Sequence, residues 1–309
     1  MVTPFTAENE IDYNAVEALV QWYLDQGVDG IFAVCQSSEM FALSLQERVE
    51  LSSFVIDRVH GRVPVVVSGH TGNSMEEQVQ ELTAMAQANP DALVLLTNRL
   101  AAQDEDDDCW LGRVRALAQQ LPPSIPLGLY ECPYPANRLL SAQTVKELAK
   151  DGRFIFYKET SCNLMQLTEK IQAALGSPLA IFNANSALYL PSLRQGAAGF
   201  CGVMGNMHPA LYKCLDALHR ASSPDTADSL QALSDFLAVT SCIESRTYPV
   251  SAKYYLQLEG LPVGLHTRTR DQQSFGDAQR VEVEGLRRMS LEMERKYRQL
   301  AGLSPRAGI

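Results

Sequence analysis

Short apolar runs alternate with longer amphipathic runs along the first two thirds of the chain. Seven of the apolar runs contain no charged position, which is typical of parallel strands that are buried on both faces beneath a layer of helices. These runs cover residues 30–34, 63–67, 92–96, 126–130, 154–157, 179–182 and 199–202. The pattern therefore predicts a parallel sheet with at least seven strands.

Amphipathic segments separate the apolar runs. Ser44 followed by Glu47, and Ser74 followed by Glu77, form capping-box signatures, so we expect a helix to begin after each serine. The spacing of apolar side chains predicts further helices over residues 13–26, 108–121, 141–150, 164–175, 186–195 and 209–221.

A strand stub at residues 1–3 would raise the number of strands to eight. Eight strand–helix units in one run predict an α/β fold, the closed (β/α)8 TIM barrel. A doubly wound sheet usually has a glycine-rich turn after its first strand, and this chain has none. After residue 221 the strand signal ends, and segments 226–243, 250–258 and 277–300 predict an appended C-terminal helical bundle. We therefore expect a catalytic barrel over residues 1–221 and a helical extension over 222–309 that packs on it.

Composition narrows the class of function. The formal net charge is −10 and the pI is near 5.0, which argues against nucleic acid and anionic membranes as partners. No apolar run is long enough to cross a bilayer, and the first residues lack the features of a signal peptide. The seven cysteines are odd in number and include no pair separated by two residues, so we expect free thiols, no metal site and a cytoplasmic protein.

In barrels of this kind the active site lies at the carboxyl ends of the strands. Lys158 ends the apolar run 154–157, and Tyr130 ends the run before it. Lys158 is either a lysine that extends to solvent or a desolvated amine able to form an imine with a carbonyl. Tyr130 is either a core tyrosine or a proton donor and acceptor. Together they suggest a nucleophile beside an acid–base group.

The loop at residues 35–39 follows another strand and contains Gln36, Ser37 and Ser38. Its hydroxyl and backbone N–H groups could hold a carboxylate. An ordinary capped loop explains the same residues.

Five fragments in this order resemble one known family. They are Thr3-Pro4-Phe5, the loop 35–39 with Leu43-Ser44, Tyr130-Glu131-Cys132-Pro133, Tyr157-Lys158-Glu159-Thr160, and the glycines 196 and 199 with Asn206. Each lies at or near a predicted strand end, and together they span residues 1 to about 210. The chain resembles the dihydrodipicolinate synthase / N-acetylneuraminate lyase family of class I aldolases.

This resemblance implies a role for each matching residue. Lys158 would form a Schiff base with pyruvate, and Tyr130 would relay protons while a carbon–carbon bond is made or broken. Ser37 would hold the pyruvate carboxylate, and the backbone carbonyl of Cys201 would lie beside the imine. The remaining substrate-binding residues would be Gln36, Ser38 and Thr160. The mechanism implies no metal and no organic cofactor, and the family's usual assembly implies a homotetramer or homodimer.

Departures from the family pattern concern the second substrate. Gln36 and Leu100 replace members of a hydroxyl relay, and Pro135 stands where synthases have an arginine that grips the aldehyde substrate. The acidic pair of sialic acid lyases is replaced by Asn185 and Ser186. Lysine biosynthesis is therefore disfavoured and sialic acid cleavage is unsupported. Arg99 and Arg138 are hypothetical anchors for a second acidic group.

Three functional hypotheses follow. The leading one is a lyase or aldolase that joins pyruvate to an aldehyde, or splits it from a 2-oxo acid or sugar acid. A dehydratase of 2-oxo-3-deoxy sugar acids would use the same imine. A non-catalytic 2-oxo acid binding protein is the third, and the presence of both Lys158 and Tyr130 argues against it. Cys35, Cys132, Cys162 and Cys201 also follow predicted strands, and we interpret them as small apolar residues near the barrel mouth.

Overall fold

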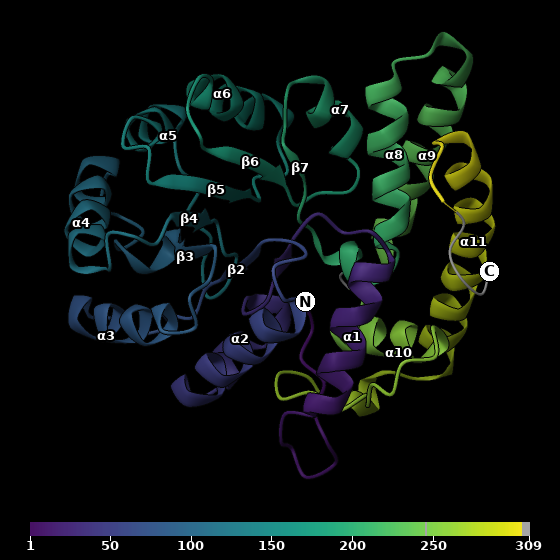
Figure 1. Cartoon of the computed structure of the whole chain (residues 1–309), viewed down its shortest axis with the longest axis horizontal. Coiled ribbons are helices and arrows are strands. Elements are labelled where there is room, and N and C mark those ends of the chain that lie inside the picture. The colour runs from purple at the N-terminus through teal and green to yellow at the C-terminus, as the bar shows by residue number, and fades with distance from the viewer. Residues whose placement is uncertain (245, 305–309) are drawn as a thin grey trace.

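A parallel sheet flanked by helices forms the centre of the computed structural model, which describes residues 1–244 and 246–304 (Figure 1). Neighbouring strands are parallel and follow the order of the chain. The strands are β1 (Ile31–Phe32), β2 (Val65–Val67), β3 (Ala92–Leu96), β4 (Leu127–Tyr130), β5 (Phe154–Glu159), β6 (Ala180–Asn183) and β7 (Gly199–Phe200). All seven predicted apolar runs therefore contain a strand, and the α/β barrel architecture is confirmed.

The predicted eighth strand at residues 1–3 is not formed. The amino group of Met1 donates to the carbonyl of Phe32 at 2.7 Å, and the Thr3 hydroxyl donates to the carbonyl of Ser38 at 2.8 Å. These contacts hold the segment against the end of β1 but make no ladder. Within the described residues β1 and β7 are not paired with each other, so the sheet remains open between them.

Helices follow the strands on the outside of the sheet. Both predicted capping boxes are present: Ser44 Oγ accepts from the Glu47 N–H at 3.2 Å, and Ser74 Oγ accepts from the Glu77 N–H at 3.1 Å. The helices are α1 (Tyr13–Asp25), α2 (Leu45–Val59), α3 (Met75–Ala86), α4 (Asp107–Gln120), α5 (Ala142–Ala149), α6 (Leu164–Ala174), α7 (Tyr189–Arg194) and α8 (Pro209–Ala221).

Helix α7 begins later than the predicted start at residue 186. The side chain of Asn185 accepts from the Leu188 N–H at 3.1 Å, and the Ser186 hydroxyl is 2.6 Å from the Tyr212 hydroxyl. Asparagine and serine compete with a helix by making such local bonds. The segment consequently turns before the helix starts.

The C-terminal helices stand beside α8 (Figure 1). They are α9 (Ala227–Thr240), α10 (Val250–Leu258) and α11 (Asp277–Leu300), and α11 packs on α8, α9 and α10. Leu286 and Tyr297 of α11 belong to the same hydrophobic core as the barrel strands. A helical extension that packs on the barrel is thus present, while a domain boundary at residue 221 stays a prediction.

A buried ion pair links this extension to the loop after β1. Lys253 Nζ of α10 lies 3.1 Å from Glu39 Oε1, and both side chains are at most 1 % exposed. The other oxygen of Glu39 accepts from the backbone N–H groups of Arg268 and Thr269 at 2.7 and 2.9 Å. The loop at residues 35–39 is therefore held in place from two directions. In the described part of the chain, no helix has the length and apolar character that a membrane span requires.

Candidate active site

Lys158 and Tyr130 lie side by side at the carboxyl ends of β5 and β4. They are direct partners in the parallel register, and Lys158 Nζ is 4.6 Å from the centroid of the Tyr130 ring. Lys158 is only 7 % exposed, and within the described residues it forms no ion pair. A lysine that is buried without a carboxylate is unusual. The predicted pairing of a buried amine with a phenol is therefore present in the fold.

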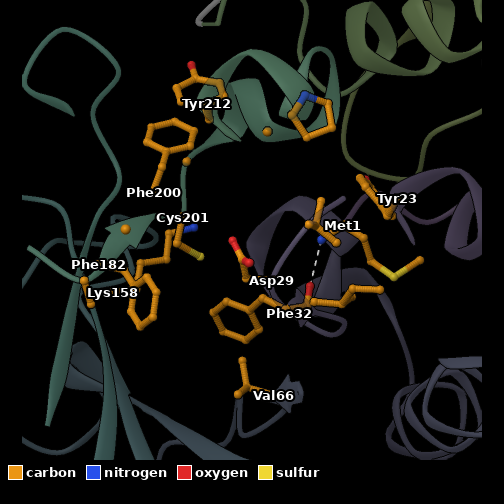
Figure 2. A pocket seen from close by; sticks show the side chains of 18 of the residues that line it. Met1, Tyr23, Asp29, Phe32, Val66, Lys158, Phe182, Phe200, Cys201 and Tyr212 are labelled. Atoms are coloured by element: carbon orange, nitrogen blue, oxygen red, sulfur yellow. Dashed lines mark hydrogen bonds between the residues drawn. The ribbon is translucent and has the colours of Figure 1, made fainter. Parts of the chain in front are cut away.

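Lys158 lines a cavity of about 410 Å³ between β1 and β7 (Figure 2). The walls near the lysine are largely aromatic and aliphatic, and they come from β1, β2, β5, β6 and β7. These residues are Phe32, Val66, Phe156, Phe182 and Phe200. An apolar wall with a few polar groups is the usual composition of a small-molecule site. The cavity also continues along the opening between β1 and β7 as far as Asp29 and Lys213.

Tyr130 contacts the loop after β1 through Gln36. Its hydroxyl donates to Gln36 Oε1 at 3.4 Å, and the Cys132 thiol lies 3.7 Å from the same oxygen. Burial, with a smaller contribution from Cys132, raises the pKa of the Tyr130 phenol well above its usual value. The phenol therefore stays protonated near neutral pH. An amide oxygen accepts this bond but cannot pass a proton onward as a hydroxyl can.

The two serines of the loop have different surroundings. Ser38 is fully buried, and its hydroxyl oxygen lies 2.9 and 2.5 Å from the backbone carbonyl oxygens of Met1 and Ala33, which share its one proton, so it stabilises the turn. Ser37 lines the cavity and lies next to the Tyr248 phenol. Of the two hydroxyls, that of Ser37 is the one beside the cavity.

Three further polar side chains, Tyr248, Asn206 and Tyr23, follow Ser37, and only Asn206 was named by the sequence pattern. Asn206 donates to the Tyr248 hydroxyl at 3.1 Å and accepts from the Tyr23 hydroxyl at 2.7 Å. Tyr23 lies on the buried face of α1, and Tyr248 comes from the C-terminal region. Only the folded chain brings these side chains together, because more than 180 residues separate Tyr23 from Asn206.

Thr160 directly follows the lysine strand β5, and Cys201 directly follows β7. The Thr160 hydroxyl donates to the Glu131 carbonyl at 2.7 Å, which joins the ends of β4 and β5. Cys201 is half-buried, lines the cavity and follows β7. A close approach of the backbone explains the next residue: a Cβ on Gly202 would lie 2.3 Å from the Ala184 carbonyl oxygen.

The two hypothetical arginine anchors point elsewhere. Arg138 donates to the backbone carbonyls of Ala102 and Glu105 at 2.8 and 2.9 Å, so it braces the segment before α4. Arg99 lies over the Phe41 ring and donates to Asn73 at 2.8 Å. Neither lines the cavity beside Lys158. The Arg138 guanidinium is therefore held within the fold, and a role of Arg99 as an anchor for a second acidic group stays a prediction.

Glu244 is a titratable group near Lys158 that the sequence pattern did not reveal. It follows α9, and burial raises the pKa of its carboxyl to about 7, although the charge of Lys158 acts in the opposite direction. Of the four cysteines expected at the mouth, Cys35, Cys132 and Cys201 are close enough to Lys158 to interact with its charge. Cys162 is exposed and bonds Asn185 instead. Among the described residues no group of three or more His, Cys, Asp or Glu side chains could hold a metal.

The sequence of the chain is similar to those of known enzymes. The chain is 28 % identical over 264 residues to the 4-hydroxy-tetrahydrodipicolinate synthase of Acaryochloris marina, covering 85 % of this chain and 87 % of that one. It is 30 % identical over 269 residues to the enzyme of the same name from Prochlorococcus marinus strain NATL2A, with 85 % of each chain covered.

Solved structures agree on the fold. Dihydrodipicolinate synthase DapA-2 from Bacillus anthracis superposes with a TM-score of 0.82 at 22 % identity, covering 93 % of this chain and 95 % of that one. YagE, a prophage protein from Escherichia coli K12 solved in complex with pyruvate, superposes with a TM-score of 0.82 at 22 % sequence identity. The match covers 94 % of this chain and 96 % of that one. The pattern of the dihydrodipicolinate synthetase family matches residues 1–270, and the chain belongs to that family.

Proposed function

We propose that this protein is a class I lyase or aldolase that makes or breaks a carbon–carbon bond between pyruvate and an aldehyde through an imine on Lys158. The observation that carries the proposal is a buried lysine that has no ion-pair partner within the described residues and lies 4.6 Å from the centroid of a tyrosine ring. A primary amine attacks a carbonyl through its nitrogen lone pair, and within the described residues no ion pair engages Lys158 Nζ. Membership of the family and a pyruvate-bound structural neighbour support the choice of pyruvate.

The reaction follows from the chemistry of the amine. The Lys158 nitrogen adds to C2 of pyruvate, and loss of water gives a protonated imine. Removal of a proton from C3 then leaves an enamine, because the imine nitrogen accepts the electron pair. The enamine carbon attacks the aldehyde, whose oxygen takes up a proton as the new bond forms. Water hydrolyses the imine, which releases the product and restores the amine. Cleavage is the same sequence in reverse.

The other site residues would orient the substrates. The protonated phenol of Tyr130 would donate and recover the proton that moves between the reacting oxygen and C3. Ser37, with backbone N–H groups of its loop, would bind the pyruvate carboxylate, and the Cys201 carbonyl would accept from the imine N–H. The aldehyde would approach past Gln36 and Thr160. We further propose a homodimer or homotetramer located in the cytoplasm, which sedimentation and cell fractionation would test.

Reductive trapping tests the imine directly. The protein is incubated with pyruvate and sodium borohydride, its intact mass is measured, and the modified peptide is mapped. We expect a reduced pyruvate adduct on Lys158 that is absent from Lys158→Ala. A folded wild-type protein that gives no adduct would refute the proposal. A product assay then separates an aldolase, which releases pyruvate from a 2-oxo acid, from a dehydratase, which releases water alone.

A further inference from the structure

A buried cluster of charged side chains lies on the outer face of the sheet, directly behind the two proposed catalytic residues. Side chains alternate between the faces of a strand. Glu131 of β4's end and Glu159 of β5 therefore point away from the cavity, toward α6. There Lys170 Nζ lies 2.7 Å from Glu131 Oε1 and 2.8 Å from Glu159 Oε1, and all three side chains are at most 2 % exposed.

Glu131 joins the residues on both sides of Lys158. Its Oε1 atom accepts from the Tyr157 hydroxyl at 2.5 Å, and its Oε2 atom accepts from the Thr160 N–H at 2.9 Å. The backbone N–H of Glu131 also donates to the Lys158 carbonyl at 3.2 Å. One side chain thus holds the strand segment that carries the reactive amine, and Lys170 fixes that side chain from the helix layer.

A gain in stability alone does not explain why charged side chains are buried between α6 and the sheet. Lys170 shares the buried face of α6 with Leu167, Ile171 and Ala174, so its neighbours along the helix are apolar. Removing charges from water costs several kcal/mol per ion, and apolar replacements of buried ion pairs are often neutral or stabilising. A cluster of two carboxylates and one ammonium is therefore expected to serve a purpose besides holding the helix to the sheet.

We propose that Lys170 is a positioning residue: bridging Glu131 and Glu159, it aligns Tyr130 with Lys158 and sets the electrostatic potential at the amine. The inference rests on the proposed role of Lys158 as the imine-forming group. Lys170 touches no substrate and acts only through the strand ends. Its positive charge balances part of the negative charge that the two carboxylates place behind Lys158.

Removing the Lys170 charge and removing the Glu159 charge should change the electrostatic potential at Lys158 in opposite directions. Losing the Lys170 ammonium makes the potential at Lys158 more negative, which favours its protonated form and disfavours attack on a carbonyl. Losing the Glu159 charge does the reverse. The titratable groups that face Lys158 on the cavity side remain in every variant, so they cannot produce opposite shifts. They are Tyr130, Cys35, Cys132, Cys201 and Glu244.

The test compares Lys170→Met with Glu159→Gln in the full chain. Glu159 Oε1 accepts from Lys170 and from the Ser161 N–H at 3.1 Å, and glutamine can keep an oxygen at that position. The measurement is the rate of cyanoborohydride-trapped pyruvate adduct between about pH 6 and 9, together with Tm. The control is Lys150→Met. The Lys150 side chain is 61 % exposed at the surface, and its Nζ atom lies 2.6 Å from Glu147 Oε1.

We expect the rising limb of the pH–rate profile to move upward in Lys170→Met and downward in Glu159→Gln, by about half a unit or more. The plateau rate of Lys170→Met should fall about tenfold, because a small misplacement of a catalytic group is costly. The control should match the wild type. Unchanged profiles in both variants, or shifts of the same sign that follow Tm, would overturn the inference.

Three further outcomes separate the possible failures. If Lys170→Met does not fold, Glu159→Gln decides the matter alone: a downward shift supports the inference and an unchanged profile refutes it. A wild-type protein that forms no adduct refutes the proposed function, and this inference with it. A wild-type adduct with unchanged variant profiles refutes only the role of Lys170.

Discussion

Lys158 Nζ lies 4.6 Å from the centre of the Tyr130 ring, and these residues are register partners on β5 and β4. The ring contacts the amine, while the hydroxyl is directed to Gln36 Oε1, 3.4 Å away. The two parts of Tyr130 therefore have separable roles. The ring helps to keep water from the amine, and the hydroxyl is the group that can move a proton.

Tyr130→Phe separates these roles, since phenylalanine keeps the ring and removes the hydroxyl. We expect the reduced pyruvate adduct on Lys158 still to form. Exchange of the C3 hydrogens of pyruvate in deuterated water should fall by about 10²–10⁴, the usual contribution of a general acid or base. Proton NMR of the pyruvate methyl group measures this exchange without any second substrate. An unchanged exchange rate would mean that another group moves the proton.

Lys253→Met tests how the C-terminal helices hold the loop at residues 35–39. The Lys253 side chain is fully buried, and its Nζ atom lies 3.1 Å from Glu39 Oε1. The substitution therefore leaves the buried Glu39 carboxylate without its cation. Breaking a buried pair costs about 3–5 kcal/mol. Chemical denaturation should therefore show a large loss of unfolding free energy. Lys150→Met, at an exposed pair with Glu147, should cost less than about 1 kcal/mol. Equal losses in the two variants would contradict the structural role assigned to the buried pair.

The sequence predicted the strands well because each strand is a short apolar run, and longer amphipathic segments separate these runs. It also located Lys158, since a polar residue at the end of such a run is unusual. The segment at residues 1–3 was wrongly interpreted as a strand, because its apolar residues instead support the loop after β1. The arginine hypothesis failed for Arg138 because sequence spacing does not reveal where a long side chain ends.

Residues from distant parts of the chain could not be found in this way. Tyr248 and Glu244 lie beyond the last strand, and only the folded chain brings Glu244 near the lysine and Tyr248 next to Ser37. Lys170 did leave a signal: it occurs at helical spacing on an apolar face, between Leu167 and Ile171. A charged residue in such a place predicts a buried partner, although the pattern does not say which one.

Two buried histidines should make the folded protein less stable in acid. Burial lowers the pKa of His208 to about 3 and that of His70 to about 4, from 6.5. His70 Nε2 accepts from the Leu96 N–H at 2.6 Å, so the ring is neutral in the fold. The unfolded chain binds these protons more readily, and stability is therefore full above about pH 6.5 and lost as the pH falls below it. Each histidine should cost roughly 2 kcal/mol at about pH 5.

His208→Phe keeps an aromatic ring and removes one of these two titrations. Between about pH 6.5 and 5, the unfolding free energy of the variant should fall less than that of the wild type. The difference should be about half of the loss that the two histidines cause together. Urea denaturation at several pH values measures the slopes. Parallel slopes for the two proteins would show that His208 is already charged in the folded state.

Glu244→Gln tests whether the C-terminal region tunes the lysine. Burial raises the pKa of the Glu244 carboxyl to about 7, so the folded protein holds this proton more tightly than the unfolded chain does. The contribution of Glu244 to stability should therefore fall as the pH rises from about 4.5 to 7, so the gain in unfolding free energy over this range should be larger in the variant than in the wild type. In the functional assay, the carboxylate that forms above about pH 7 favours the protonated amine of Lys158. Its removal should move the rising limb of the adduct-formation profile to lower pH. A profile that keeps its wild-type midpoint, in a variant of normal Tm, would mean that the Glu244 charge is screened from the amine and that the outer cluster around Lys170 acts alone.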